Sequence, residues 1–109
     1  MSKQLNFEFE GKQYCLEYPR KSVASMEQNG FRASDISDKP MTVLPSLFAG
    51  AFLAHHRYLK RDIIDSIFDK MKDKGELIGK LAQMYNEPIE AYMEEPEEAE
   101  GNVKWEASW

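Results

Sequence analysis

The chain has 109 residues, enough for one domain built around a single core. Its 14 lysines and arginines are outnumbered by 19 aspartates and glutamates, which argues against a general binder of the nucleic-acid phosphate backbone. A single cysteine, Cys15, excludes an internal disulfide, and the first residues lack the apolar core of a signal peptide. We therefore expect an intracellular, reducing compartment.

Residues 5–18 predict a β-hairpin, because apolar residues alternate with polar ones along both halves of the stretch. A two-residue loop at Gly11-Lys12 would place glycine where a type II′ turn requires it. This loop sets the register and puts six apolar side chains on one face, as the cross-strand pairs Phe9–Tyr14, Phe7–Leu16 and Leu5–Tyr18. Cys15 then falls on the opposite, polar face.

The next stretch predicts a short helix from Arg20 to Gln28, opened by the proline at position 19. Gly30 is expected to end this helix in a left-handed conformation, with Phe31 folding back onto Met26. Residues 32–40 are polar and end in proline, so they read as a connection with Ile36 as its anchor.

Residues 41–59 form the longest weakly charged run, and we expect it to contain the central helix, starting near Pro45. Apolar side chains recur there at three- and four-residue spacing, as helical packing on a core requires. The run is shorter than the ~20 consecutive apolar residues that a membrane span needs. Its stripe consists of Leu44, Leu47, Phe48, Ala51, Phe52, Ala54, His55 and Leu59.

A bend is expected within residues 57–62, followed by a helix over residues 63–74 that stops at Gly75. A further helix is predicted for residues 76–86, with Pro88 ending or restarting it and one more apolar turn at residues 89–93. The pattern predicts an α+β fold: an N-terminal two-stranded antiparallel hairpin packed on a three- to four-helix core. We assign residues 1–93 to one globular domain and residues 94–109 to a disordered acidic tail.

The chain's net negative charge lies in its C-terminal part, which ends in aromatic residues. Residues 86–109 contain eight acidic residues and one lysine, and the last seven residues bring in Val103, Trp105 and Trp109. Tryptophan is costly to expose, so we expect these side chains to dock on this domain or on another protein. Together with Tyr92, they are the predicted partner-binding residues.

The residues that could suggest a catalytic or metal-binding site have simpler interpretations. Adjacent helical residues point about 100° apart, so His55 and His56 cannot chelate one ion, and we expect one at the core edge and the other in solvent. The aspartates at positions 62, 65, 69 and 73 fit a solvated helix face. A strand position near Glu8 would raise the pKa of Cys15 and disfavour a nucleophilic thiolate. We expect no catalytic, cofactor or metal site and therefore no enzymatic activity.

Four stretches of the chain carry a family resemblance: Met26-Glu27-x-x-Gly30-Phe31, Asp38-Lys39-Pro40 leading into Leu44-Pro45-x-Leu47-Phe48-Ala49-Gly50-Ala51-Phe52, Met84-Tyr85-Asn86-Glu87-Pro88, and Asn102-Val103-Lys104-Trp105-x-x-x-Trp109. Together they resemble a family of small proteins from tailed phages and prophages of Gram-positive bacteria that we associate with tail assembly chaperones. The resemblance implies a non-enzymatic protein in the host cytoplasm that binds tail tube or tape-measure protein and is absent from the finished particle.

Two alternatives remain beside the chaperone. The same composition would suit a structural protein that stays in the virion as a tail or connector subunit. A small nucleic-acid-associated regulator would have to act through the basic cluster Arg57, Lys60 and Arg61, which lies beside the aspartates. A homo-oligomer is compatible with all three, and a membrane partner with none.

Overall fold

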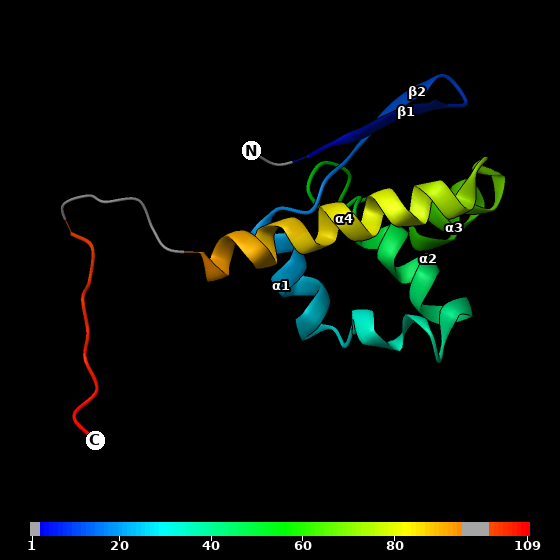
Figure 1. Ribbon diagram of the computed structural model, residues 1–109. Coiled ribbons are helices and arrows are strands. Elements are labelled where there is room, and N and C mark those ends of the chain that lie inside the picture. Colours follow the sequence, from blue (N-terminus) through cyan, green and yellow to red (C-terminus); the bar gives the residue numbers. More distant parts are fainter. Residues whose placement is uncertain (1–2, 95–100) are drawn as a thin grey trace.

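The computed structural model describes residues 3–94 and 101–109, and it confirms the predicted α+β fold of a hairpin followed by helices (Figure 1). In the view of Figure 1 the hairpin lies above the long helix α4, and α1 and α2 lie below it. The elements are β1 (Leu5–Phe9), β2 (Lys12–Leu16), α1 (Arg20–Gln28), the 3₁₀ helix η1 (Ala33–Ile36), α2 (Pro40–Gly50), α3 (Arg61–Lys70) and α4 (Lys74–Met93).

The predicted hairpin exists, but its predicted register is wrong by two residues. Phe9 pairs with Lys12 and Phe7 with Tyr14, so Phe9 does not lie opposite Tyr14. The loop consists of Glu10 and Gly11, both with positive φ (51° and 79°), as a type I′ turn requires. This turn type matches the twist of the strands, and a slip of two residues keeps every side chain on its predicted face.

Helix α1 has the predicted bounds and the predicted ending. Gly30 has a φ of 93°, the Phe31 N–H bonds to the Met26 carbonyl at 2.9 Å, and the Gly30 N–H bonds to the Glu27 carbonyl at 3.0 Å. These are the two hydrogen bonds of a Schellman motif. The following connection contains the short helix η1, which the sequence did not predict, and Ile36 within it is half-buried.

The central helix is displaced from its predicted position. Helix α2 already begins at Pro40, because proline at the first helical position needs no N–H partner, and Pro45 lies inside it. The helix ends at Gly50, after which residues 51–59 run in turns. The Ala51 N–H bonds to the Phe48 carbonyl, which leaves the Leu47 carbonyl to accept the Tyr18 hydroxyl instead. Burial raises the pKa of Tyr18, and Tyr85 adds to the shift.

The boundary between the last two helices also differs from the prediction. Helix α3 ends at Lys70, and Gly75 belongs to the first turn of α4 rather than ending α3. Asp73 makes the reversal with a left-handed φ of 54°, and the Lys74 ammonium donates to the carbonyls of Asp69 and Met71. Helix α4 continues through Pro88 because its apolar face is held in the core by Leu77, Leu81, Met84 and Tyr85.

Helix α2 is the centre of the packing, as predicted for this stretch, and contacts α1, α3, α4 and η1. Phe48 and Phe52 are fully buried, and their ring centroids lie 5.1 Å apart. The rings of Phe7 and Tyr14 in the hairpin make edge contacts with the Phe52 ring. On the hairpin's apolar face, the chain that leaves α2 therefore packs against Phe7 and Tyr14, and Lys70 of α3 lies over the Phe9 ring.

The predicted division at residue 93 stays a prediction, because residues 95–100 lie outside the described residues. Residues 101–109 contain no helix or strand, and each of them is exposed. Within the described parts of the chain, no helix has the length and apolarity needed to cross a membrane.

Candidate partner-binding surfaces

The four predicted partner-binding residues are all exposed. Trp105 is 81% exposed, Val103 87% and Tyr92 65%, and Trp109 is fully exposed. Tyr92 lies in the last turn of α4, where the Arg20 guanidinium sits 3.9 Å from its ring centroid. The described ring contacts do not join Tyr92 to either tryptophan. The structure thus leaves two separate aromatic positions available to a partner, one on α4 and one on the C-terminal segment.

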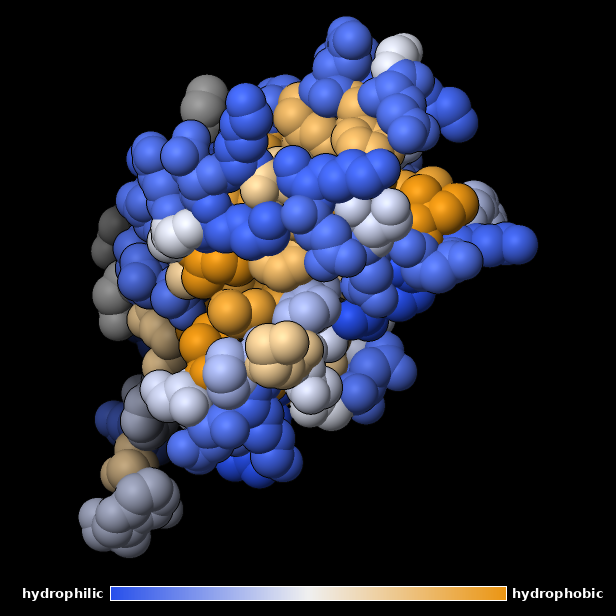
Figure 2. All heavy atoms as spheres, turned by 90° about the vertical axis from the view of Figure 1, so that its right-hand side faces the viewer, coloured by the Kyte–Doolittle hydropathy of each residue, from blue (hydrophilic) through white to orange (hydrophobic). Residues whose placement is uncertain are grey.

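A groove between α1, α2 and α3 is a further candidate that sequence reasoning missed. It encloses about 480 Å³. The apolar side chains that line it are Met26, Phe31, Val43, Leu53, Leu59 and Ile64. These residues come from distant parts of the chain, so no local pattern indicated that they would share a surface. On the face turned to the viewer in Figure 2, neighbouring apolar side chains form an area left of the centre that hydrophilic side chains border.

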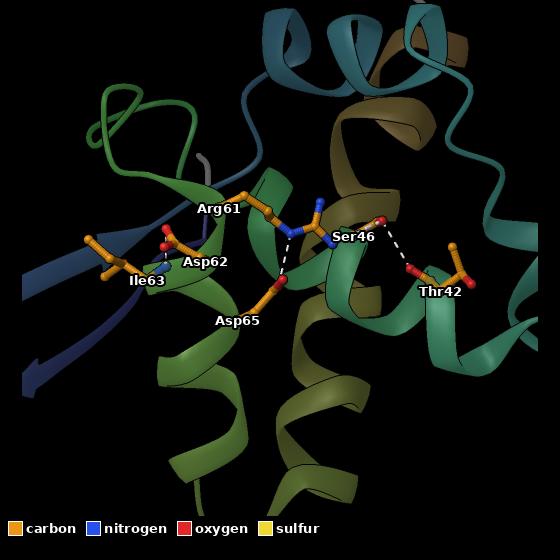
Figure 3. Close-up of polar contacts among 6 residues, drawn as sticks. All are labelled: Thr42, Ser46, Arg61, Asp62, Ile63 and Asp65. Atoms are coloured by element: carbon orange, nitrogen blue, oxygen red, sulfur yellow. Dashed lines mark hydrogen bonds and ion pairs between the residues drawn. The ribbon is translucent and has the colours of Figure 1, made fainter.

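A small polar network forms part of the groove's edge (Figure 3). The Arg61 Nε donates to Asp65 Oδ1 at 2.8 Å, its Nη2 donates to the Ser46 hydroxyl at 3.4 Å, and Ser46 donates to the Thr42 carbonyl at 3.0 Å. These contacts link α3 to α2. They also partly neutralise Arg61, which belongs to the predicted basic cluster, so that cluster presents less positive charge than its sequence indicates.

The two histidines have different environments, as predicted for a packed and a solvated pair. His56 packs against Tyr14, with ring centroids 5.1 Å apart, and its Nε2 accepts the Cys15 backbone N–H at 3.1 Å. Burial lowers the pKa of His56, and the neighbouring His55 lowers it further. His55 is exposed, and its Nε2 lies 2.7 Å from a Glu17 carboxylate oxygen. His56 therefore connects the hairpin to the chain that follows α2.

Cys15 lies in surroundings that favour its neutral thiol over the thiolate. Burial raises the pKa of the Cys15 thiol, and Glu17 rather than the predicted Glu8 adds to the shift. Glu8 lies opposite Gln13, which donates to it at 2.7 Å. Among the residues that the structure describes, no three His, Cys, Asp or Glu side chains are close enough to hold a metal ion.

Comparison with known families adds one finding. A family model described as "Domain of unknown function (DUF5055)" matches residues 1–109. The chain belongs to this family. No curated protein and no solved structure matches it. The match spans the hairpin, the helices and the C-terminal segment, and the family's description assigns no function.

Proposed function

We propose that this protein is a non-enzymatic phage tail assembly chaperone that binds tail tube or tape-measure protein during tail morphogenesis. The observation that carries the proposal is the exposure of Trp105 and Trp109 at the end of an acidic segment. The sequence resemblance to tail assembly chaperones supplies the biological setting.

Exposed tryptophans of this kind favour protein binding over catalysis. An indole buries on the order of 150–250 Å² when it enters a partner's pocket, and tryptophan is enriched among the residues that dominate binding energy. Both tryptophans of this chain lie within five residues of each other. One short segment can therefore supply two anchors.

The composition around these anchors suits reversible binding of an aggregation-prone client. Five of the seven residues 94–100 are glutamates, which favour solubility and weaken non-specific association. Met41 and Met93 are more than 80% exposed, and the flexible methionine side chain adapts to differently shaped apolar partners. A client can thus be held through few strong contacts and released during assembly.

Co-expression with the tail tube or tape-measure protein of the same genome tests the proposal. We expect a complex with the full chain, and at least a tenfold loss of affinity in a Trp105→Ala, Trp109→Ala double variant. Tyr58→Ala is the matched control, because Tyr58 is also an aromatic residue, 93% exposed, but lies far along the chain in the turn segment after α2. Failure to recover either client with the full chain would count against the proposal.

Mass spectrometry of purified virions separates the chaperone from a structural tail or connector protein. A chaperone should be missing from the particle, whereas a structural subunit would be present in stoichiometric amounts. A nucleic-acid-associated regulator would instead shift DNA or RNA in a salt-dependent manner at micromolar protein.

A further inference from the structure

The outer edge of β1 has unused backbone hydrogen-bonding groups. In a hairpin with a two-residue loop, the residue pairs alternate between exchanging both backbone hydrogen bonds and exchanging none. Asn6 and Glu8 belong to the pairs that exchange none, so their N–H and C=O groups point away from β2. Among the described residues, no hydrogen bond reaches these groups. β1 is therefore an open edge strand.

The outer edge of β2, in contrast, is occupied within the chain. The Cys15 N–H donates to the His56 ring, and the Glu17 N–H donates to the Ala51 carbonyl at 3.1 Å. Both acceptors lie in the segment that follows α2. The chain itself thus blocks the outer edge of β2 at Cys15 and Glu17, whereas the β1 edge is open along its whole length.

The apolar face of the hairpin is also incomplete at β1. Tyr14 and Leu16 of β2 are buried, with exposed fractions of 7% and 0%. Leu5, Phe7 and Phe9 of β1 are only half-buried, although they point to the same face. A third strand beside β1 would cover the apolar surface that the helices leave open.

The C-terminal segment has the pattern that such a strand requires. From position 103 the sequence reads Val-Lys-Trp-Glu-Ala-Ser-Trp, in which apolar and polar residues alternate without exception. In an extended conformation the four apolar side chains share one face, as in a half-covered strand. The segment forms no strand within the chain and is fully solvent-exposed.

We propose that residues 103–109 of a second copy of this chain add to the β1 edge as an antiparallel third strand. Both halves of the contact, the open edge and the exposed segment, are unused within one chain, so a second copy can satisfy them without breaking any existing interaction. Reciprocal exchange of the two segments would close a symmetric dimer.

Side-chain chemistry selects one register for this strand addition. With Lys104 opposite Glu8, Trp105 lies opposite Phe7 and Glu106 lies opposite Asn6. This arrangement forms a cross-strand ion pair and an aromatic pair. The parallel arrangement with Trp105 beside Phe7 would instead bring Glu106 against Glu8, a like-charge contact that is unfavourable.

The association itself is measured by analytical ultracentrifugation of the full-length protein, with tryptophan emission recorded over the same concentrations. Both tryptophans lie in the segment, so their emission reports on it alone. We expect a monomer with red-shifted emission at low concentration and a dimer with blue-shifted emission at high concentration.

A pair of proline variants tests the strand geometry. In the proposed register the Glu106 N–H points at β1, whereas the Ala107 N–H points away. Glu106→Pro should therefore weaken dimerisation at least tenfold, while Ala107→Pro should leave it within about threefold of the unmodified protein. Glu106→Gln controls for the lost charge. Because these positions lie outside every helix and strand of the fold, the variants should keep the stability of the domain.

A charge exchange tests the register and the identity of the partner. Glu8→Lys and Lys104→Glu should each weaken dimerisation severalfold, because each puts like charges opposite one another. A mixture of the two single variants should restore it, since an edge with lysine then meets a segment with glutamate. Lys80→Glu on α4 is the control of equal charge change at an exposed site.

Three results would overturn the proposal. They are a monomer with red-shifted emission at every concentration, a blue-shifted monomer whose emission does not change with concentration, and a dimer that survives Glu106→Pro. The second of these would mean that the segment docks on its own chain. The inference uses the segment to which we assign client binding, but its test contains no client, so the two proposals can fail independently.

Discussion

Gly50 of α2 packs against the Met26 side chain of α1, and replacing it with alanine should destabilise the fold. A Cβ atom at this position would lie 2.4 Å from the Sδ and Cε atoms of Met26 and 3.0 Å from its Cγ. Met26 is 5% exposed but also lines the groove, so its thioether end can move only by turning into that groove. The clash must therefore be relieved by a new Met26 rotamer or by separation of the two helices.

The size of the effect follows from two opposing contributions. Overpacking a core by one methyl group costs about 1–3 kcal/mol, whereas alanine gains about 0.5–1 kcal/mol over glycine in a helix. Subtracting the gain from the cost, we expect Gly50→Ala to lower the free energy of unfolding by up to about 2.5 kcal/mol. For a domain of this size each 1 kcal/mol corresponds to a decrease of about 4–8 °C in the melting temperature.

Gly79→Ala is the matched control, because Gly79 lies inside α4 and a Cβ atom added there would have open space within 4 Å. It should raise stability by about 0.5–1 kcal/mol. Urea denaturation followed by far-UV circular dichroism measures both variants, since the tryptophans do not report on the core. A Gly50→Ala protein as stable as the Gly79→Ala protein would refute the reasoning. In a Met26→Ala background, the cost of Gly50→Ala should disappear.

Three further predictions concern single side chains. Tyr18→Phe should lower the free energy of unfolding by about 1–3 kcal/mol in urea denaturation, because the Leu47 carbonyl loses its donor; an unchanged midpoint would contradict this role. Glu10 is left-handed in the turn, and asparagine adopts this conformation more readily than glutamate, so Glu10→Asn should raise the free energy of unfolding by a few tenths to about 1 kcal/mol. A loss of stability would instead support the Gly11-Lys12 loop. Burial and the neighbouring His55 lower the pKa of His56 in the folded protein. As the pH falls through about 6.5, this histidine is therefore protonated more readily in the unfolded chain than in the folded one, which favours unfolding. Thermal melting between pH 5 and 8 should therefore show a loss of stability at acidic pH that is smaller in His56→Gln, and equal profiles for the two proteins would contradict it.

Prediction from sequence succeeded where the signal is local. The hairpin's two faces follow from the alternation of apolar and polar residues, and the end of α1 follows from the backbone freedom of Gly30. In each case the deciding interactions lie within a few residues along the chain.

Prediction failed where several arrangements satisfy the same local pattern. Loops at Glu10-Gly11 and at Gly11-Lys12 both place the hairpin's apolar side chains on one face. In the folded protein the hairpin also contacts Phe52 and His56, which lie far along the chain, and a local pattern contains no information about these contacts. Gly75 and Pro88 resembled helix ends, yet Gly75 lies in the first turn of α4, and the helix continues through Pro88 because its apolar face is buried.

The amino-acid sequence by itself determined the fold class, the faces of the strands and helices, and the separation of a near-neutral body from an acidic, tryptophan-ended segment. Only the tertiary structure decided where α2 ends, which groove its packing forms with α1 and α3, and which edge of the hairpin remains open. The physical reason is that periodicity and backbone preference act between neighbouring residues, whereas a groove or a free edge depends on which distant segments pack together and which backbone groups they leave unbonded.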